Sequence, residues 1–131
     1  MERYADIPVM KIADVDPYKA FMRDYRAATH PNPIDSNARI YADMWLEVDS
    51  WREDESIRFE FMLTMDQGKG NAHKALKMLT YLADKHQVAM SLGASPTGNL
   101  ENKMNRSQLM SFYKRYGFKS IGGEEMRREP K

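Results

Sequence analysis

At 131 residues, the chain is long enough to bury the hydrophobic core of one domain, and we expect a single domain over residues 1–131. Its 20 basic and 19 acidic side chains give a net charge of +1, so it lacks the basic excess that marks a nucleic-acid-binding element. The absence of cysteine excludes disulfides, thiolate zinc sites and a thiol nucleophile, and fits a reducing cytoplasm. No run reaches the ~18 apolar residues of a membrane span, so we expect a cytoplasmic protein without membrane contact.

The amino-terminal third predicts a short strand and a helix. Residues 7–13 fit a strand whose start is made irregular by Pro8. Asp16 and Pro17 fit the N-cap and first position of a helix, and residues 30–33, with two prolines, should end it in a loop. The apolar stripe of this helix comprises Tyr18, Phe21, Met22 and Tyr25.

Residues 39–49 are compatible with two structures. Every second residue of 40–48 is apolar, as in a strand with one buried face. Several of these side chains would also line one face of a helix, but we favour the strand. A charged turn over residues 49–56 then leads to a clear strand over residues 57–65, in which large apolar side chains alternate with others.

The carboxyl-terminal half predicts alternating helices and strands. Apolar residues repeat at helical spacing over 73–87, as in a helix that packs on a sheet. Residues 88–94 are almost all apolar, as in a strand buried on both faces, and the strand–helix–strand unit should form a parallel crossover. A polar loop over 95–105 precedes a last helix over 106–116, which Gly117 should end. Two short strands, over 118–121 and 124–128, should flank a glycine turn.

The turn between the strand at 57–65 and the helix at 73–87 is the most informative segment. It contains Gly68, Gly70 and Ala72, so little side chain keeps a ligand away from the backbone. The unpaired N–H groups at the start of the helix, with the positive end of its dipole, face the same point. This geometry suits a phosphate or diphosphate.

Two common phosphate motifs do not fit this turn. The P-loop string GxxxxGK[ST] does not occur in the chain. A dinucleotide fingerprint requires GxGxxG and an acid at the end of the next strand, but His73 stands at the third glycine position and residues 88–94 contain no acid.

The pattern that fits is Q/R-x-x-G-x-G/A, met by Gln67, Gly70 and Ala72, and it resembles the acyl-coenzyme A loop of the GNAT N-acetyltransferase superfamily. The run Phe112-Tyr113-Lys114-Arg115-Tyr116-Gly117-Phe118 resembles the second landmark of that superfamily, an aromatic helix ending in Tyr-x-x-x-Gly-Phe. The order of elements over 57–131 is also similar.

The resemblance implies an α/β (α+β) fold, in which a mixed, mostly antiparallel, twisted sheet is flanked by helices. The cofactor-binding core would be residues 57–131. The short length and the ending at residues 126–130 are similar to small GNAT proteins predicted in bacteriophage genomes, which would place the chain in the host cytoplasm. The amino-terminal half departs from the family because it has fewer expected strands, so the acceptor pocket cannot be carried over.

The resemblance further implies binding of acetyl-coenzyme A. The turn would hold the diphosphate, and the pantetheine arm would lie where the strands before and after the helix diverge. The implied cofactor contacts are Leu63, Thr64, Met65, Gln67, Gly68, Lys69, Gly70, Asn71, Ala72, Asn105 and Ser107. Asn105 stands about one residue away from the usual position of the family's asparagine.

By the same resemblance, Tyr113 would give a proton to the departing thiolate, while the alternative is a tyrosine that fills the core. Tyr116 is expected to pack. Glu60 is the first candidate for the base, although an exposed strand glutamate is the competing interpretation. Weaker candidates are Glu47, Asp49 and a water chain. His30, His73 and His86 show no ligand spacing, and we expect no metal.

The sequence therefore predicts acetyl transfer to an unidentified amine, on a small molecule or a protein, by direct attack. The second hypothesis is a catalytically inactive binding protein of the same fold, for example a phage factor that engages a host protein through Trp45 and Trp51. A third, weaker hypothesis is an acetylating toxin or counter-defence enzyme with a macromolecular acceptor. A homodimer is compatible with each hypothesis.

Overall fold

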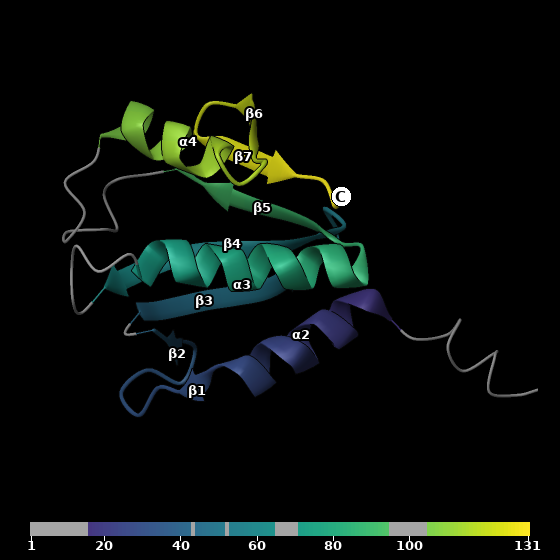
Figure 1. Cartoon of the computed structure of the whole chain (residues 1–131), viewed down its shortest axis with the longest axis vertical. Helices are drawn as coiled ribbons and strands as arrows, with labels where there is room; N and C mark the ends of the chain where they lie inside the picture. The colour runs from purple at the N-terminus through teal and green to yellow at the C-terminus, as the bar shows by residue number, and fades with distance from the viewer. Residues whose placement is uncertain (1–15, 43, 52, 65–70, 95–104) are drawn as a thin grey trace, which may run out of the picture.

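The structure is a computed structural model that describes residues 16–42, 44–51, 53–64, 71–94 and 105–131, with only the backbone at residues 60–64 and 71. The described residues form three helices and seven strands (Figure 1). The helices are α2 (Pro17–Ala28), α3 (Asn71–His86) and α4 (Arg106–Lys114). The strands are β1 (His30–Pro31), β2 (Arg39–Tyr41), β3 (Met44–Trp51), β4 (Ser56–Thr64), β5 (Ala89–Gly93), β6 (Lys119–Gly122) and β7 (Glu125–Arg128). The predicted strand at 7–13 lies outside the described residues.

All seven strands belong to one open sheet, in the order β1-β2-β3-β4-β5-β7-β6. Five neighbouring pairs are antiparallel, and only β4 and β5 run parallel. The expected α/β class with a mixed, mostly antiparallel sheet is therefore confirmed, as is the parallel pair on either side of α3. Among the described residues, no helix combines the length and the apolar character that crossing a membrane requires.

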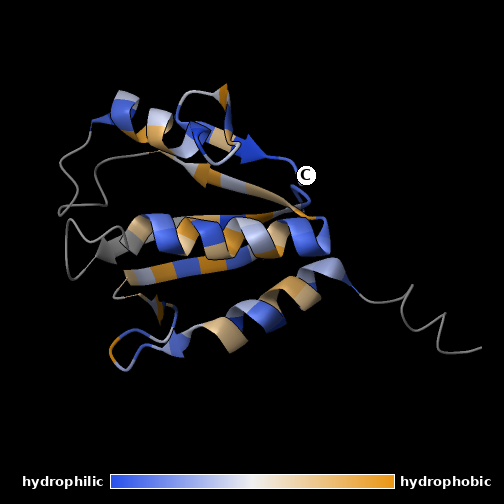
Figure 2. Ribbon diagram, in the orientation of Figure 1, coloured by the Kyte–Doolittle hydropathy of each residue, from blue (hydrophilic) through white to orange (hydrophobic). Residues whose placement is uncertain are grey.

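The hydrophobic core lies between the sheet and the helices. Buried side chains of all three helices form one cluster with those of β3, β4 and β5. Figure 1 shows α3 in front of β3 and β4, with α2 on the β3 side and α4 on the β5 side. Along β3, Met44, Leu46 and Val48 are buried and the residues between them are more exposed, which Figure 2 shows as alternating hydrophobic and hydrophilic bands. We call the opposite side of the sheet, which carries Glu47 and Asp49, the back face.

The helix α2 begins as predicted. The side chain of Asp16 accepts hydrogen bonds from the N–H groups of Tyr18 and Lys19, at 2.9 and 3.4 Å, and Pro17 is the first helical residue. The expected loop at 30–33 is partly wrong, because His30–Pro31 pairs with β2 as a short edge strand.

Residues 39–49 contain two strands rather than one. Extended structure is confirmed, but β2 and β3 form an antiparallel pair, and Ala42 between them has a φ of 50°. The apolar alternation of the sequence continues through this turn, so the hydrophobic pattern does not reveal it. β3 also extends to Trp51, which shortens the charged turn expected at 49–56.

In the carboxyl-terminal half, every expected element is found within two residues of its predicted ends. Gly117 has a φ of 98°, a conformation that residues with a side chain rarely adopt, and it follows α4 as expected. β6 and β7 pair across the glycine turn. Of the loop expected at 95–105, only Asn105 is among the described residues.

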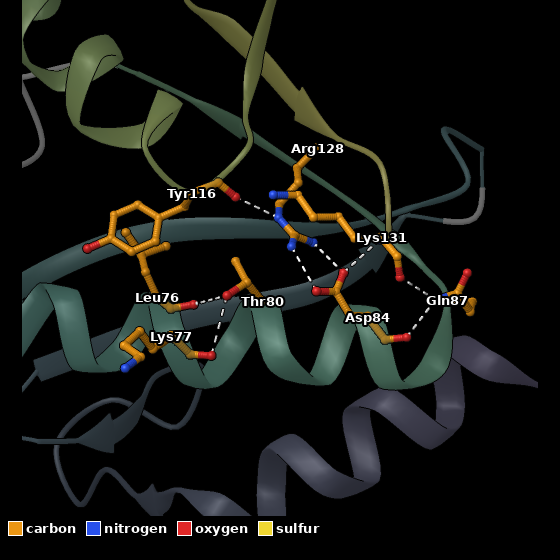
Figure 3. A network of polar contacts seen from close by, with 8 residues as sticks. All are labelled: Leu76, Lys77, Thr80, Asp84, Gln87, Tyr116, Arg128 and Lys131. Carbon is orange, nitrogen blue, oxygen red and sulfur yellow. Dashed lines mark hydrogen bonds and ion pairs between the residues drawn. The ribbon is translucent and has the colours of Figure 1, made fainter.

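A buried ion pair joins the last strand to α3 (Figure 3). Arg128 on β7 donates to both carboxylate oxygens of Asp84 on α3, at 2.9 and 3.0 Å, and its Nε donates to the carbonyl oxygen of Tyr116 at 2.7 Å. The Arg128 side chain is 3% exposed, and its hydrogen bonds hold the pKa of Asp84 below its usual value. β7, the turn after α4 and α3 are thus held as one unit.

Replacement of Asp84 by asparagine should lower the free energy of unfolding by about 2 kcal/mol, because the buried guanidinium would lose its carboxylate while Asp84 itself is partly exposed. Since the pKa of Asp84 is lowered on folding, this stabilisation is present above the ordinary carboxyl pKa of about 3.9 and is lost as the pH falls through the folded value. Urea unfolding at a series of pH values should show the gap between parent and Asp84→Asn narrowing below about pH 4.

The control for this prediction is Glu129→Gln, which removes a carboxylate that is 69% exposed and pairs with Arg127 on the surface. It should change stability by less than about 0.5 kcal/mol. Equal losses in the two variants would contradict the structural role of the Arg128–Asp84 pair.

Candidate functional site

The main feature of the candidate site is the separation of β4 from β5. The two strands pair over three residues each, and Arg58 with Ser91 is the last pair. Beyond it β4 continues to Thr64 and β5 to Gly93 without pairing with each other. Figure 1 shows the two strand ends diverging, and we call this opening the fork.

In the part of the chain that the structure describes, no strand pairs with the fork side of β4 beyond Arg58. On its other side β4 stays paired with β3 as far as Thr64. Because successive residues of a strand direct their N–H and C=O groups to opposite sides, about half of these groups in residues 59–64 face the fork. An extended polar molecule could form hydrogen bonds with them in the manner of an added strand.

Two helices begin at the open end of the fork. Figure 1 shows the start of α3 beside the end of β4, and the start of α4 at the same end of the molecule. Asn71 is the first residue of α3 and Ala72 the second, so the predicted turn does lead into a helix. Outside the described residues are Met65, Gln67, Gly68, Lys69 and Gly70.

Tyr113 of α4 lies against Phe59, the first residue of β4 after the last β4–β5 pair. The two ring centroids are 6.4 Å apart with the edge of one ring on the face of the other, and Phe118 packs on Tyr113 at 5.9 Å. The residue is 4% exposed, and burial raises the pKa of Tyr113 well above its usual value. Its phenol is therefore protonated at neutral pH, and its ring is also part of the core.

His73, in the first turn of α3, contacts Tyr116, in the turn after α4. Nδ1 of His73 lies 2.5 Å from the hydroxyl oxygen of Tyr116, and the ring centroids are 5.7 Å apart. Tyr116 packs against the core as expected. His73 is exposed, and no local sequence pattern indicated this hydrogen bond with Tyr116, 43 residues further along the chain.

An ion pair crosses the base of the fork on the back face. Nη1 and Nη2 of Arg58 donate to the two carboxylate oxygens of Glu125, at 2.6 and 3.0 Å, and lower the pKa of Glu125. The pair passes close over Gly93, where a Cβ atom would lie 3.2 Å from Nη2 of Arg58 and from Oε2 of Glu125. β4, β5 and β7 are thus tied together where the fork begins. Sequence reasoning missed this pair because its partners lie 67 residues apart and no local pattern connects them.

The other predicted site residues are only partly placed. Glu60, Leu63 and Thr64 belong to β4, so their backbone lies along the fork. Asn105 is the N-cap of α4, and its side-chain oxygen accepts the N–H of Gln108 at 2.8 Å. Ser107 is exposed in the first turn of α4. Contact of these residues with a cofactor stays a prediction.

The two tryptophans of the binding-protein hypothesis and the two weaker candidates for the base differ in exposure. Trp51 is 44% exposed, whereas Trp45 is partly buried. Asp49 is exposed and Glu47 is partly buried, both on β3.

The described histidines do not form a metal site. Nε2 of His86 lies 2.8 Å from Oδ2 of Asp24. Within the described residues no group of three histidine, aspartate or glutamate side chains could hold a metal ion, and the absence of a metal stays a prediction.

No family model, curated protein or solved structure matches the chain. The relation to the GNAT superfamily therefore stays a prediction from the two sequence landmarks.

Truncation of Tyr113 to alanine should lower the free energy of unfolding by about 3–5 kcal/mol, because it removes an aromatic ring from the core. Tyr113→Phe should change it by no more than about 1 kcal/mol, since the ring is kept. Tyr81→Ala, at a residue that is 65% exposed on α3, is the matched control and should change it by less than about 0.5 kcal/mol. Denaturant unfolding measures all three. A small effect of Tyr113→Ala would contradict the buried placement.

Proposed function

We propose that the protein is an N-acetyltransferase that transfers an acetyl group from acetyl-coenzyme A to an amine, with the fork as the cofactor site. The observation that carries this proposal is the end of β4–β5 pairing after Arg58 and Ser91 while both strands continue. The fork opens at the end of the sheet where α3 begins. Backbone groups of β4 beyond this point and the first N–H groups of α3 would therefore both contact one extended ligand.

The ligand that suits this arrangement has an amide-bearing arm and a diphosphate. Backbone groups of Leu63 and Thr64 would pair with the amides of pantetheine. The diphosphate would meet the start of α3, where N–H groups of residues 68–72 and the helix dipole favour negative charge. The sequence motif and the fork support the same ligand from independent observations.

Acetyl-coenzyme A supplies an acyl group that is activated as a thioester. In the proposed reaction a neutral amine attacks the carbonyl carbon, so that a C–N bond forms and the C–S bond breaks. Backbone N–H groups at residues 63–65 would stabilise charge on the carbonyl oxygen. Tyr113 would give its phenolic proton to the departing thiolate, and the raised pKa keeps that proton in place until then. Glu60, or water beside it, would accept the proton lost by the amine.

The placement of Tyr113 supports its proposed role, because it contacts Phe59 at the point where β4 leaves β5. The same burial fits a purely structural tyrosine. Only a comparison of turnover with stability separates the two roles.

A binding protein without turnover is the second candidate, and the half-exposed Trp51 favours it. The guanidinium carbon of Arg58 lies 4.8 Å from the centroid of the Trp51 ring, so the exposed indole is held in place as an interface residue would be. This candidate predicts no response to acetyl-coenzyme A.

Acetyl-coenzyme A should raise the unfolding temperature of the protein, because a ligand at a hundredfold excess over its Kd stabilises the folded state by about 2.7 kcal/mol. Gly70→Asp should abolish this shift by placing a carboxylate against the diphosphate. Tyr81→Asp adds the same charge ten residues, or about 15 Å, from the first residue of α3 and should leave the shift intact. Differential scanning fluorimetry measures the three proteins. No shift in the parent protein at millimolar ligand favours the binding-protein candidate.

Tyr113→Phe should lower turnover about a hundredfold while the affinity for acetyl-coenzyme A stays within about twofold, because only the proton donor is lost. The assay follows thiol release from acetyl-coenzyme A with a panel of primary amines, and isothermal titration gives the affinity. Tyr116→Phe is the matched control and should retain most of the turnover. Unchanged turnover in Tyr113→Phe would remove the acid assignment and leave Tyr113 as a core residue.

A further inference from the structure

A cavity of about 520 Å³ lies away from the open end of the fork, between α2, the segment before β2, and β3. Side chains of α2, including Met22 and Tyr25, line it beside residues of β3. The charged residues Arg26, Arg39, Glu47 and Asp49 also line it. This volume is in the range of natural ligand sites.

The cavity coincides with an open sheet edge. β2 pairs with β3 only from Met44 to Leu46, whereas β3 continues to Trp51. Among the described strands, residues 48–51 pair on one side only, with β4. Unpaired N–H and C=O groups on such an edge are a template for an added strand.

Two arginines stand at the end of this edge, where β2 begins. Nε of Arg39 donates to the hydroxyl of Thr29 at 2.6 Å, and Nη2 donates to the carbonyl oxygens of Arg26 and Thr29, each at 3.1 Å. The guanidinium of Arg39 is therefore held in one orientation by neutral groups. Among the described residues, neither Arg26 nor Arg39 has a carboxylate at ion-pair distance, so both charges are available to an anion.

The direction of β2 determines which end of a peptide would meet these arginines. β2 runs antiparallel to β3, and Arg39, its first residue, faces Leu46. A peptide that lies along residues 48–51 in the same direction as β2 would reach Arg39 with its carboxyl end. The free carboxylate of that peptide would then lie beside the guanidinium groups of Arg39 and Arg26.

From these observations we propose that the open edge of β3 binds the carboxyl-terminal segment of an extended peptide. The peptide adds as a strand antiparallel to β3, and its terminal carboxylate binds Arg26 and Arg39. This peptide site is separate from the fork and does not depend on acetyl transfer.

The two sides of the edge give the peptide different environments. Arg39 and Leu46 are opposite residues of an antiparallel pair, so their side chains share the face that α2 covers. The side chain of Asp49 lies on the back face, as the alternation along β3 requires. Glu47 and Asp49 of β3 line the same cavity, so it holds carboxylates as well as the two arginines. We expect a preference for a basic peptide side chain opposite Asp49.

The test uses the full chain and an array of random hexapeptides with free carboxyl termini, beside the same peptides as carboxamides. Peptides selected on the array should bind in solution at least ten times more tightly as acids than as amides. Arg26→Gln should remove this preference, because it deletes one of the two guanidinium groups. Arg23→Gln is the matched control on the same helix, at a side chain that is 71% exposed, and should keep the preference.

Hydrogen exchange locates the bound peptide. Those amides of residues 48–51 that face the open edge should become protected, while the amides that face β4 should not change. Peptides with N-methyl groups at alternate residues should lose affinity, because they cannot form the ladder. Equal binding of acids and amides, protection elsewhere, or an unchanged preference in Arg26→Gln would each overturn the proposal. Binding of inorganic phosphate at Arg26 and Arg39 without peptide binding would also overturn it, in favour of a small-anion site.

Discussion

The parallel ladder between β4 and β5 is only three residues long on each strand, and the candidate site depends on this short contact. Each further pair would have used the backbone groups that the fork leaves available. The Arg58–Glu125 ion pair closes the base of the fork on the back face, and Tyr113 packs on Phe59 on the helix side. The fork is therefore fixed at its base and open at its end, as a site for an extended ligand requires.

Polar contacts between distant segments hold the helices around this fork. Arg128 links β7 to Asp84 of α3 and to the turn after α4, and the His73–Tyr116 hydrogen bond joins the first turn of α3 to the same turn. Because α4 is anchored at that turn, the ring of Tyr113 is held against β4. The stability of the fold and the proposed chemistry thus depend partly on the same residues. The fold can accommodate the buried charge of Arg128 because its hydrogen-bond partners are also held in place.

The two proposed sites use one physical property of β-strands in different places. Among the described strands, pairing of β4 with β5 ends at Arg58, and pairing of β3 with β2 ends at Leu46. In both places an extended molecule could form hydrogen bonds with the strand as a further strand would. A positively charged group lies at one end of each strand edge. That group is the start of α3 for a diphosphate and the pair Arg26 and Arg39 for a carboxylate.

The sequence by itself determined the elements whose signals are local. The helical periodicity of α3, the apolar run of β5, the Asp16-Pro17 start of α2 and the glycine after α4 all depend on residues within a few positions of each other. The sequence did not reveal the turn at Ala42, because the alternation of apolar residues continues through it. The separation of β4 from β5 was expected from the family resemblance alone, whereas the Arg58–Glu125 pair and the open edge of β3 were decided only by tertiary structure. Both features depend on segments that are far apart in the chain. The local pattern of apolar and polar residues does not determine where two strands stop pairing or which distant charges form an ion pair.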